Sequence, residues 1–416
     1  MQIWYINHYA TPPANGSFGR PYALAKSFQK KGHGVTVFCA SYHHLRQVAA
    51  LPDDLYRISE CDGVGYYHLP ARSYSGNGLA RVMNMIDFSR EIGRLSKKIN
   101  CGEIAPPDIV IPSCVHPLVF PPARKLAMEY RAKLIYEVRD IWPLSLVELS
   151  GVSPFHPLVL WFGWIERQAY RHADAVVSLL PNALKHMASR GLDKEKFYFI
   201  PNGINREEWG LPPVSLPEEH RRFFHQLRTE GKLIVVYAGA HGPPNALDQI
   251  LNLSKLDTGK TKPYHFACIG DGLEKEKLMR RVSDDAISFV TFLPKITKQQ
   301  VISALALADV CFIASPKKKI YTYGTSPNKL GDYFMSCKPV LNALDTTGND
   351  LVRDAGAGIT VEPYNAAQLE DALMLFCEMS EGERKKMGEN GRKYALKNLD
   401  WDVLGGRYAA ICESLF

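Results

Sequence analysis

The stretch "YTYGTSPNKLGDYFMSCKPVLNA", Tyr321 to Ala343, joins a helix start to a following buried strand. Pro327 fits the first turn of a helix, and Ser326 is a suitable residue to cap that helix. The helix carries Lys329 and Asp332 three residues apart on one face, and "CKPVL" then reads as a buried strand. Helix starts of this kind hold phosphates and sugar hydroxyls. The stretch therefore predicts an α/β fold with a ligand site at a strand–helix junction.

The same alternation of apolar strands and helical patterns runs through the rest of the chain and predicts parallel sheets with helices on both faces. It pauses once, at the Pro-rich segment "PNGINREEWGLPPVSLPEE" of residues 201–219, and then starts again. We expect two Rossmann-like, doubly wound domains facing across a cleft, the first spanning 1–204 and the second 205–395. Strands are expected at "IWYIN", "VTVFCA", "DIVIPS", "KLIYEV", "DAVVSLL" and "KFYFIP", and then at "LIVVYAGA", "YHFACIGDG", "ISFVTFLP", "DVCFIAS" and "KPVLNAL".

Composition agrees with a two-domain globular protein. The chain has 416 residues, of which 46% are hydrophobic and 22% are charged. Its net charge of +7 is modest, and the only basic run is Lys317 to Lys319. These features argue against a nucleic-acid binder and are compatible with an anionic small ligand or a loose attraction to anionic lipid.

The cysteines indicate neither a disulfide framework nor a metal site. There are nine of them, far apart in the sequence, with no C-x-x-C, HExxH or Cys/His cluster at metal spacing. These spacings predict no structural zinc, and no cofactor is expected. Met1 leads directly into a strand, and the longest apolar run, residues 157–165, is too short to span a bilayer. The reducing cytoplasm is the expected compartment.

The first strand–helix junction, "NHYATPPANGSFGRPYALAKSF", is a candidate phosphate site. Gly16 and Gly19 would let the backbone approach a ligand, and Arg20 has a guanidinium suited to phosphate. The spacing is not G-x-G-x-x-G, so a dinucleotide fingerprint is absent. The alternative is a glycine loop followed by a solvated arginine.

A second candidate is the charged end of the strand in "LIYEVRDIWPLS". Glu137, Arg139 and Asp140 follow a hydrophobic run at the carboxyl end of a strand, where α/β active sites lie. Charges in such a place are costly unless they are paired or used. The alternative is a structural ion pair of Arg139 with Glu137 or with Asp140.

The second domain offers two further glycine loops. In "VVYAGAHGPPNALDQIL", Gly239 and Gly242 with His241 could receive a diphosphate, although a tight turn would look similar. "CIGDGLEKEKL", with Gly270, is a third and equally weak junction. At the opening stretch, Asp332 could accept both hydroxyls of a ribose and Lys329 could meet the phosphates; a surface ion pair is the alternative.

Two segments could touch a membrane. In "GNGLARVMNMIDFSREIGRLSKKI" the apolar residues of 79–99 follow helical spacing and are flanked by arginines and lysines, so this segment is a candidate for reversible membrane contact. An ordinary amphipathic surface helix is the alternative. In "LWFGWIERQAYRHADAVV", Trp161, Phe162, Trp164 and Ile165 could form a membrane-facing wedge, although packing as core is favoured.

Six runs, in order, resemble glycosyltransferase family 4 enzymes of the GT-B fold. They are "INHYATPP…GSFGRPYALAKSFQKKGHGVTVF", "YEVRDIWP", "ERQAYRHADAVVSL", "IPNGIN", "YAGAHG" and "SPNKLGDYFMSCKPVL". The chain is most similar to the bacterial branch that builds O-antigen and capsule repeat units, including N-acetylfucosaminyl transferases. "NLDWDVLGGRYAAI" resembles the family's last helix, which implies that residues 396–416 cross back to the first domain.

The resemblance implies a retaining transfer of a sugar from a nucleotide diphosphate without a metal. Asp332 occupies the place of the ribose-binding carboxylate, and Arg139 that of a residue lining the reaction centre. The sequence departs from the family at several positions: Asp332 stands where the family has Glu, and Arg139 where it usually has His. Gly324 replaces a glutamate that meets the donor sugar, Ala240 and Asn245 replace an Arg and a Lys against the phosphates, and Cys337 replaces a common Gly.

From these departures we hypothesise that Arg139, Arg20 and Lys329, with the amides of 239–242, compensate the diphosphate charge. Sugar recognition would then move to the amides of Thr325 and Ser326 and to Tyr321 or Tyr323. The expected catalytic residues are Arg139, Asp140, Glu137 and Lys329; the expected donor-binding residues are Gly16, Gly19, Arg20, Gly239, His241, Gly242, Gly270, Tyr323, Thr325, Ser326, Pro327, Asn328 and Asp332.

The expected donor is a UDP-sugar, with an N-acetylated or deoxy hexosamine as the sugar. The expected acceptor is a saccharide on undecaprenyl diphosphate, which would bring the enzyme to the cytoplasmic face of the inner membrane. A nucleotide-sugar epimerase of similar architecture and a non-catalytic homologue that only binds nucleotide sugar are the alternatives.

Overall fold

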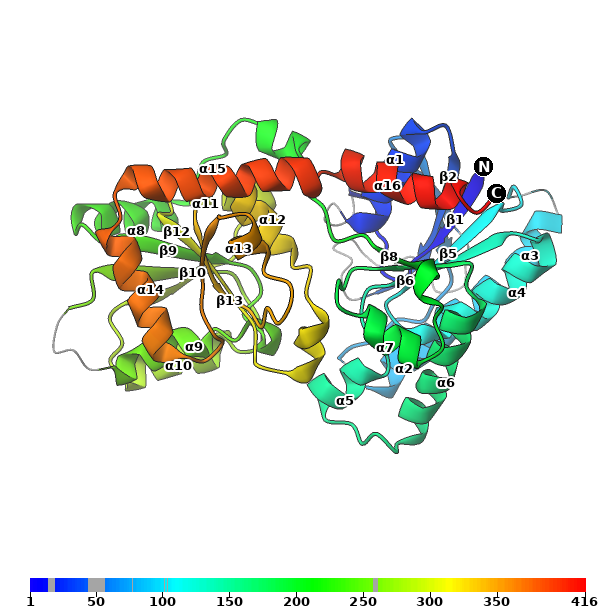
Figure 1. Cartoon of the computed structure of the whole chain (residues 1–416), viewed down its shortest axis with the longest axis horizontal. Helices are drawn as coiled ribbons and strands as arrows, with labels where there is room; N and C mark the ends of the chain where they lie inside the picture. Colours follow the sequence, from blue (N-terminus) through cyan, green and yellow to red (C-terminus); the bar gives the residue numbers. More distant parts are fainter. Residues whose placement is uncertain (14–18, 44–56, 77, 101, 103, 257–260) are drawn as a thin grey trace. The chain divides into compact units, whose positions relative to one another are not determined.

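A computed structural model describes residues 1–13, 19–43, 57–76, 78–100, 102, 104–256 and 261–416. The chain forms two compact units. Met1–Asn202 with Trp401–Phe416 make up the N-terminal unit, and Gly203–Asp400 the C-terminal unit. Each unit has a central sheet covered by helices (Figure 1), so the predicted class of two doubly wound α/β sheets is confirmed.

The sheet of the N-terminal unit has eight strands in the order β3-β4-β2-β1-β5-β6-β7-β8. Every neighbouring pair is parallel except β3 and β4. The strands are β1 (Gln2–Ile6), β2 (Gly34–Ala40), β3 (Arg57–Cys61), β4 (Val64–Leu69), β5 (Ile109–Cys114), β6 (Lys133–Val138), β7 (Ala175–Ser178) and β8 (Phe197–Phe199).

The hairpin of β3 and β4 was not predicted from the sequence, and it places an antiparallel edge on a sheet expected to be parallel. Cys61 pairs with Val64, so Asp62 and Gly63 form a two-residue turn. Both turn residues have positive φ, 51° and 79°. Asp-Gly is the preferred sequence for such a turn, and it was the local signal for this hairpin.

Helices cover both faces of this sheet (Figure 1). Ser27 of α1 donates to Trp401 O of α16 at 3.1 Å, which ties the last helix to the first. The helices are α1 (Arg20–Lys30), α2 (Leu79–Gly93), α3 (Leu95–Asn100), η2 (Pro117–Val119), α4 (Phe120–Tyr130), α5 (Leu144–Ser150), α6 (Pro157–His172), α7 (Leu184–Ser189), η3 (Lys194–Lys196) and α16 (Trp401–Glu413).

The sheet of the C-terminal unit has six parallel strands in the order β11-β10-β9-β12-β13-β14. Large aliphatic and aromatic side chains of the strands are fully buried on both faces, as expected for a parallel sheet. The strands are β9 (Leu233–Ala238), β10 (Tyr264–Ile269), β11 (Val290–Leu293), β12 (Val310–Ala314), β13 (Val340–Ala343) and β14 (Gly358–Thr360).

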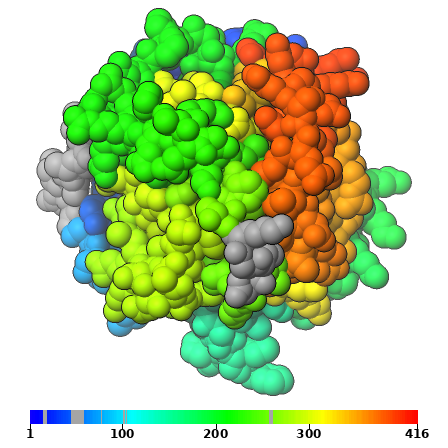
Figure 2. All heavy atoms as spheres, turned by 90° about the vertical axis from the view of Figure 1, so that its left-hand side faces the viewer, coloured from blue at the N-terminus to red at the C-terminus, as the bar shows by residue number. Residues whose placement is uncertain are grey.

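The helices of the C-terminal unit include α14 and α15, which form the orange band along one side of the unit in Figure 2. The segment 396–416 contains the end of α15 and all of α16. The helices are η4 (Glu207–Gly210), α8 (Glu218–Thr229), η5 (Pro243–Asn245), α9 (Asp248–Leu251), η6 (Asn252–Lys255), α10 (Lys275–Asp284), α11 (Lys298–Ala306), η7 (Lys319–Tyr323), α12 (Asn328–Met335), α13 (Leu351–Asp354), α14 (Ala366–Glu378) and α15 (Glu381–Asn398).

Each sheet has one point at which the direction of chain progression reverses. It lies between β1 and β5 in the N-terminal unit and between β9 and β12 in the C-terminal unit. The loops that follow these strands lie where open α/β sheets bind ligands. These two switch points are therefore the places at which we examine the predicted site residues.

Candidate functional site

Lys329 of α12 lies directly over the loop that follows β9 in the C-terminal unit. Its Nζ donates to Asn245 Oδ1 at 2.8 Å and lies 5.3 Å from the centroid of the Tyr237 ring. A Cβ on Gly239 would be 2.1 Å from Lys329 Cε, so a residue without a side chain is needed for the lysine to cross the loop. Burial lowers the pKa of Lys329 to about 8, and the charge of Asp332 opposes that shift. The ammonium is thus held by an amide and a ring, and no carboxylate of the described residues lies at hydrogen-bond distance from it.

The loop after β9 offers fewer free amides than the sequence predicted. The N–H groups of Gly239 and His241 donate to Ile269 O and Asp271 O at 2.9 and 2.8 Å. Two prolines follow Gly242 and have no N–H. They begin the 3₁₀ turn η5, and α9 has only four residues. The expected diphosphate site at the start of a regular helix is therefore wrong, and only the amides of Ala240 and Gly242 remain candidates.

His241 and Gly270 serve the packing of this edge. His241 is fully buried, and burial, reinforced by Lys275 and Lys329 and opposed by a nearby aspartate, lowers its pKa to about 4. The ring is therefore neutral at pH 7 and contributes no positive charge to a donor. A Cβ on Gly270 would lie 1.9 Å from Gly239 O, so this glycine allows the loops after β9 and β10 to approach each other.

Asp332 pairs with a lysine that the sequence did not single out. Lys298, the first residue of α11, places its Nζ 2.5 Å from Asp332 Oδ2. A second carboxylate, Glu208 of η4, lies near this pair. Burial and the charge of Asp332 raise the pKa of Glu208, and Lys298 opposes the shift. Two carboxylates and one lysine from three separate elements thus share this part of the unit.

Gly324 shows why the family glutamate is absent at this position. Its φ is 91° and its ψ 166°, a backbone conformation that residues with a side chain rarely adopt. Cys337, with φ of 55°, follows the end of α12 in the left-handed region that favours glycine. Any side chain at position 324, a carboxylate included, would strain the backbone. Cys337 carries a side chain in a conformation that favours glycine.

The loop between η7 and α12 differs from the prediction in its cap. Pro327 itself is the residue before the helix, with no side-chain cap hydrogen bond, so the predicted Ser326 cap is wrong. Asn328 begins the helix and is exposed. The other expected donor-binding positions of this loop, Tyr323, Thr325 and Ser326, are partly buried.

In the N-terminal unit, Glu137 and Arg20 form an ion pair inside the protein. Arg20 Nη2 lies 2.9 Å from Glu137 Oε2, and the two side chains are 1% and 0% exposed. Arg20 also donates to Pro201 O at 2.6 Å. Tyr5 and Ser113 hydroxyls donate to Glu137 Oε1, the second at 2.7 Å. The burial leaves Arg20 no surface for a phosphate and Glu137 none for a substrate, which corrects both assignments.

The electrostatics agree with a structural role for this pair. Burial alone would raise the pKa of Glu137, but the Arg20 charge and the hydrogen bonds lower it below its ordinary value. Conversely, Glu137 raises the pKa of Arg20 against the effect of burial. Both groups are thus charged, and they join β6 to the start of α1, directly after Gly19, the residue that precedes that helix. Gly16 lies outside the described residues.

Arg139 and Asp140 follow β6 and remain accessible. Asp140 is exposed and Arg139 is partly buried. Arg139 makes no ion pair with any residue of the part of the chain that the structure describes. The alternative of an ion pair between Arg139 and Glu137 is therefore wrong, because Glu137 is taken by Arg20. The charge of Arg139 does act on Asp140, whose pKa burial raises and Arg139 lowers. Of the three charges at this strand end, Arg139 and Asp140 are the two that a substrate can reach.

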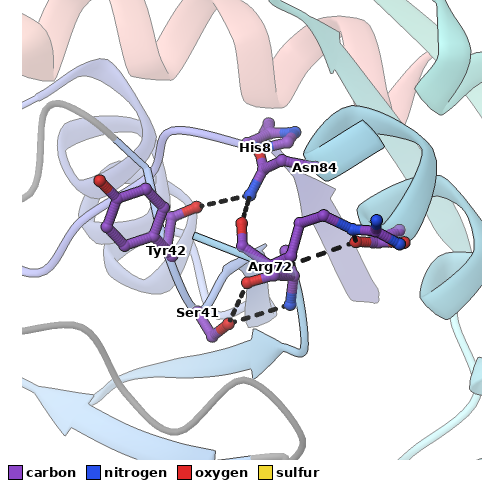
Figure 3. Close-up of polar contacts among 7 residues, drawn as sticks. His8, Ser41, Tyr42, Arg72 and Asn84 are labelled. Carbon is purple, nitrogen blue, oxygen red and sulfur yellow. Dashed lines mark hydrogen bonds and ion pairs between the residues drawn. The ribbon is translucent and has the colours of Figure 1, made fainter. Parts of the chain in front are cut away.

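A buried histidine pair at the switch point of the N-terminal unit was missed by the sequence analysis. His8 follows β1 and His116 follows β5, and His8 Nδ1 lies 2.8 Å from His116 Nε2. His8 Nε2 lies 2.8 Å from Asn84 Oδ1 of α2. Asn84 Nδ2 in turn donates to Tyr42 O and Arg72 O at 3.2 and 2.7 Å (Figure 3). The network joins the ends of both switch-point strands to α2.

The hydrogen-bond network assigns the tautomers of the two histidines. Burial lowers the pKa of His8 well below its ordinary value and that of His116 to about 3, so both rings are neutral. Since Asn84 Nδ2 donates to two carbonyls, Asn84 Oδ1 must accept, and His8 carries its proton on Nε2. His8 Nδ1 then accepts from His116 Nε2. Only the tertiary structure brings these residues together, since they are 76 and 108 residues apart.

The described residues contain neither a membrane-spanning helix nor a metal site. No helix there is long and apolar enough to cross a membrane. No group of three or more His, Cys, Asp or Glu side chains in those residues could hold a metal ion. The eight cysteines within the described ranges form no disulfide with one another.

Both units match family models of glycosyltransferases. Residues 20–203 match the glycosyl transferase 4-like domain, and residues 219–394 match the glycosyl transferases group 1 domain. The two matches together cover nearly all of both units. The chain is therefore a glycosyltransferase of the GT-B type.

Solved structures share the fold at low sequence identity. Sucrose-phosphate synthase from Thermosynechococcus elongatus superimposes with a TM-score of 0.72 at 17% identity, covering 100% of this chain and 99% of its own. WaaG, a glycosyltransferase involved in lipopolysaccharide biosynthesis, gives 0.66 at 16% identity over 99% of both chains. Anabaena HepE in complex with UDP and glucose gives 0.64 at 14% over 100% of both chains.

A partial likeness of a different kind was also found. Over 165 residues the chain is 27% identical to adenine deaminases of Pseudomonas savastanoi pv. phaseolicola and Pseudomonas syringae pv. syringae. That stretch is 38% of this chain and 47% of each relative, so the chain spans about half the length of the curated relatives it matches. The deaminase name is not carried over, because the two glycosyltransferase domains account for both units.

Proposed function

We propose that the protein is a retaining glycosyltransferase that transfers a sugar from UDP to a hydroxyl of a saccharide acceptor without a metal. The observation that carries this proposal is the position of the Lys329 ammonium over Gly239 at the switch point of the C-terminal unit. Breaking the bond between sugar and diphosphate leaves a diphosphate that gains negative charge in the transition state. Only groups that interact more strongly at that point accelerate the step.

Lys329 is suited to this task because it is already partly desolvated. Its pKa of about 8 keeps it mostly protonated at neutral pH, and its single amide partner, Asn245, can be exchanged for phosphate oxygens. The amides of Ala240 and Gly242 would add neutral donors. A nucleotide with its diphosphate there would extend its ribose along α12 toward Asp332, where Lys298 and Glu208 lie nearby.

The sugar and the acceptor are assigned from the resemblance to the O-antigen and capsule branch. We propose an N-acetylated or deoxy hexosamine as the sugar and a saccharide on undecaprenyl diphosphate as the acceptor, in bacterial surface polysaccharide biosynthesis. With no carboxylate at Gly324, the donor sugar would be held by the amides around Thr325 and Ser326 and by Tyr323. Arg139 and Asp140 would face the acceptor in the N-terminal unit. The enzyme would then work in the cytoplasm, in contact with the inner membrane.

A thermal-shift panel of UDP, GDP, ADP and CMP, with EDTA present throughout, tests the nucleotide. We expect UDP and UDP-sugars to give the largest increase in melting temperature, and addition of magnesium to leave it unchanged. A preference for another nucleotide, or an effect of UDP that appears only with magnesium, would contradict the proposal.

One rival reading is favoured by a specific observation. Ala240, Asn245 and Gly324 all lack the charged groups of the family, so a homologue that binds UDP-sugar without turnover must be distinguished. Release of UDP from UDP-N-acetylhexosamine in the presence of membrane extract would support transfer. Stabilisation without any release would support the non-catalytic reading, and a changed sugar on intact UDP would indicate an epimerase.

A further inference from the structure

Two helices of the N-terminal unit, α2 and α6, differ in how far their apolar side chains are exposed. Along α2, the segment from which membrane contact was predicted, Met85, Phe88 and Ile92 are buried, and Leu95 at the start of α3 is buried as well. They pack toward α4 and the sheet, where the helix is found in contact with α4 and η2. Only Leu79, at its first turn, is strongly exposed at 75%. Val82, Met83 and Ile86 of the same helix are partly buried, so most of its apolar stripe is used for packing. The reversible membrane contact expected of residues 79–99 stays a prediction.

On α6, by contrast, apolar side chains lie on both faces. Phe162 and Ile165 are buried at 2% and 1%, and Phe162 packs edge-to-face against the Trp142 ring at 5.9 Å. Trp161 and Trp164, three residues apart, are 46% and 56% exposed. The inward face of α6 is thus complete without the two tryptophans. The predicted wedge of four residues is divided into two buried anchors and two outward rings.

More apolar surface continues from the two tryptophans. Leu160 on the same turn of α6 is 59% exposed, and Phe155, just before the helix, is 84% exposed. Met128 of α4, 69% exposed, lines with Trp164 a hollow of about 210 Å³ between α4 and α6. We call the surface made of Met128, Leu160, Trp161 and Trp164 the tryptophan face.

Cations border the tryptophan face. Arg124 and Lys125 of α4 line the same hollow, and Arg167 and Arg171 are exposed on α6 one and two turns beyond Trp164. One exposed carboxylate, Glu129, lies next to Met128 in the sequence. These cations also act on His172. Burial is the main cause that lowers its pKa, and the charges of Arg124, Arg171 and Lys196 lower it further. Apolar rings edged by an excess of arginine and lysine complement an anionic lipid surface.

We propose that the tryptophan face docks the N-terminal unit on an anionic membrane, with Trp161 and Trp164 at the level of the lipid headgroups and the four cations on lipid phosphates. This inference deepens the proposed function, because an acceptor carried on lipid must be met at such a surface. Neither tryptophan belongs to the strand-end residues assigned to donor or acceptor, so docking and transfer can be tested separately.

Co-sedimentation of the full chain with vesicles tests the docking. We expect binding to vesicles of phosphatidylcholine mixed with phosphatidylglycerol and weaker binding to phosphatidylcholine alone. The pair Trp161→Ser with Trp164→Ser should lower the partition coefficient by about tenfold or more, because two half-exposed rings no longer enter the interface. Lys125→Ala should lower it by about fivefold on the anionic vesicles only.

Matched controls lie elsewhere on the surface. Leu79→Ser removes an apolar side chain that is more exposed than either tryptophan, and Lys97→Ala removes an exposed lysine of α3. Both should leave the partition coefficient unchanged. Brominated lipid should quench the fluorescence of the wild type. The pair Trp161→Phe with Trp164→Phe should still bind and should lose this quenching.

Unchanged binding of the serine pair, or an equal loss with Leu79→Ser, would overturn the proposal. The proposal would also be overturned if the chain did not bind vesicles and instead dimerised through the tryptophan face. In that case the wild type would be a dimer and the serine pair a monomer. The increase in melting temperature with UDP should be the same in wild type and serine pair. Its absence in both would contradict the proposed function and leave the vesicle result standing.

Discussion

At the switch point of the N-terminal unit, Glu137, Arg20, His8 and His116 all have partners inside the protein, and none has exposed surface. At the switch point of the C-terminal unit, Lys329 crosses a glycine with one amide for a partner, and its pKa lies near neutrality. The first arrangement fixes strand ends and a helix start. In the proposed function, the second supplies a cation to a ligand. Equivalent edges of two similar sheets thus differ: one is a rigid support and the other is the proposed binding surface.

The largest effect is expected from removing one charge of the rigid support. Glu137→Gln leaves the buried Arg20 guanidinium without its counter-ion, and such a change costs about 3–5 kcal/mol of unfolding free energy. Hydrogen exchange of β1 and β6 peptides in urea would measure it. Asp402→Asn is the matched control, because it breaks an ion pair of the same helix, Lys30–Asp402, whose side chains are 56% and 51% exposed. It should cost about 0–1 kcal/mol. Equal losses would show that burial does not distinguish the two pairs.

The second prediction concerns the binding surface. Lys329→Met should lower turnover of UDP-sugar about a hundredfold, roughly 3 kcal/mol, since one preorganised donor to the leaving diphosphate is lost. Stability should not fall, because a desolvated lysine is replaced by an apolar chain. UDP release and thermal melting of the same variant measure both quantities. Lys317→Met, which removes an exposed lysine of the loop after β12, should retain wild-type turnover. Wild-type turnover in Lys329→Met would exclude this role for the lysine.

A smaller loss of stability is expected at the histidine pair. Asn84→Leu leaves His8 Nε2–H and two backbone carbonyls without partners, which costs about 1–3 kcal/mol. Urea unfolding of the N-terminal unit would measure it. Gln29→Leu also removes a side-chain bond to a backbone carbonyl, that of Gly63, but at an exposed place, so it should change stability by less than about 0.5 kcal/mol. Equal changes in unfolding free energy in the two variants would show that the buried network does not stabilise this end of the sheet.

Local pattern predicted the strands and their order of appearance well, because buried parallel strands are short apolar runs between glycine-rich turns. It also placed Lys329 on a helix start and glycine at 239, since both are local features. The partners were not predictable. Arg20 and Glu137 are 117 residues apart, and Lys298 and Asp332 are 34 apart, so their pairing depends on how the sheet brings strand ends together.

The two segments predicted to touch a membrane, α2 and α6, also show the limit of a local pattern. Helical spacing shows that apolar residues share a face, but it does not show whether another element covers that face. Along α2 a neighbouring helix covers it. On α6 the apolar residues occupy adjacent positions, 161 and 162 and again 164 and 165. Neighbours in a helix are about 100° apart around its axis, so Phe162 and Ile165 are buried while Trp161 and Trp164 stay about half exposed. Adjacent apolar pairs in a helix were the signal for the exposed rings.

The last prediction uses pH to separate the two switch points. Lys329 has a folded pKa of about 8 against an ordinary value of 10.5. Without ligand it is protonated below pH 8 and loses its charge as the pH rises through that value. Bound phosphate favours the charged form and raises this pKa, so binding takes up a proton in the window from about 8 to about 10. UDP affinity should therefore fall by up to about tenfold between pH 7.5 and pH 9, a change of about 1.4 kcal/mol.

Calorimetric titration with UDP at several pH values, in two buffers of different ionisation enthalpy, would measure both the affinity and the proton uptake. Lys329→Met should bind more weakly and show a flat profile over the same range. His8, His116 and His241 are neutral throughout this window, because burial keeps their pKa values far below it. A profile that stays steep in Lys329→Met would place the titrating group elsewhere and would remove the cation from the binding surface.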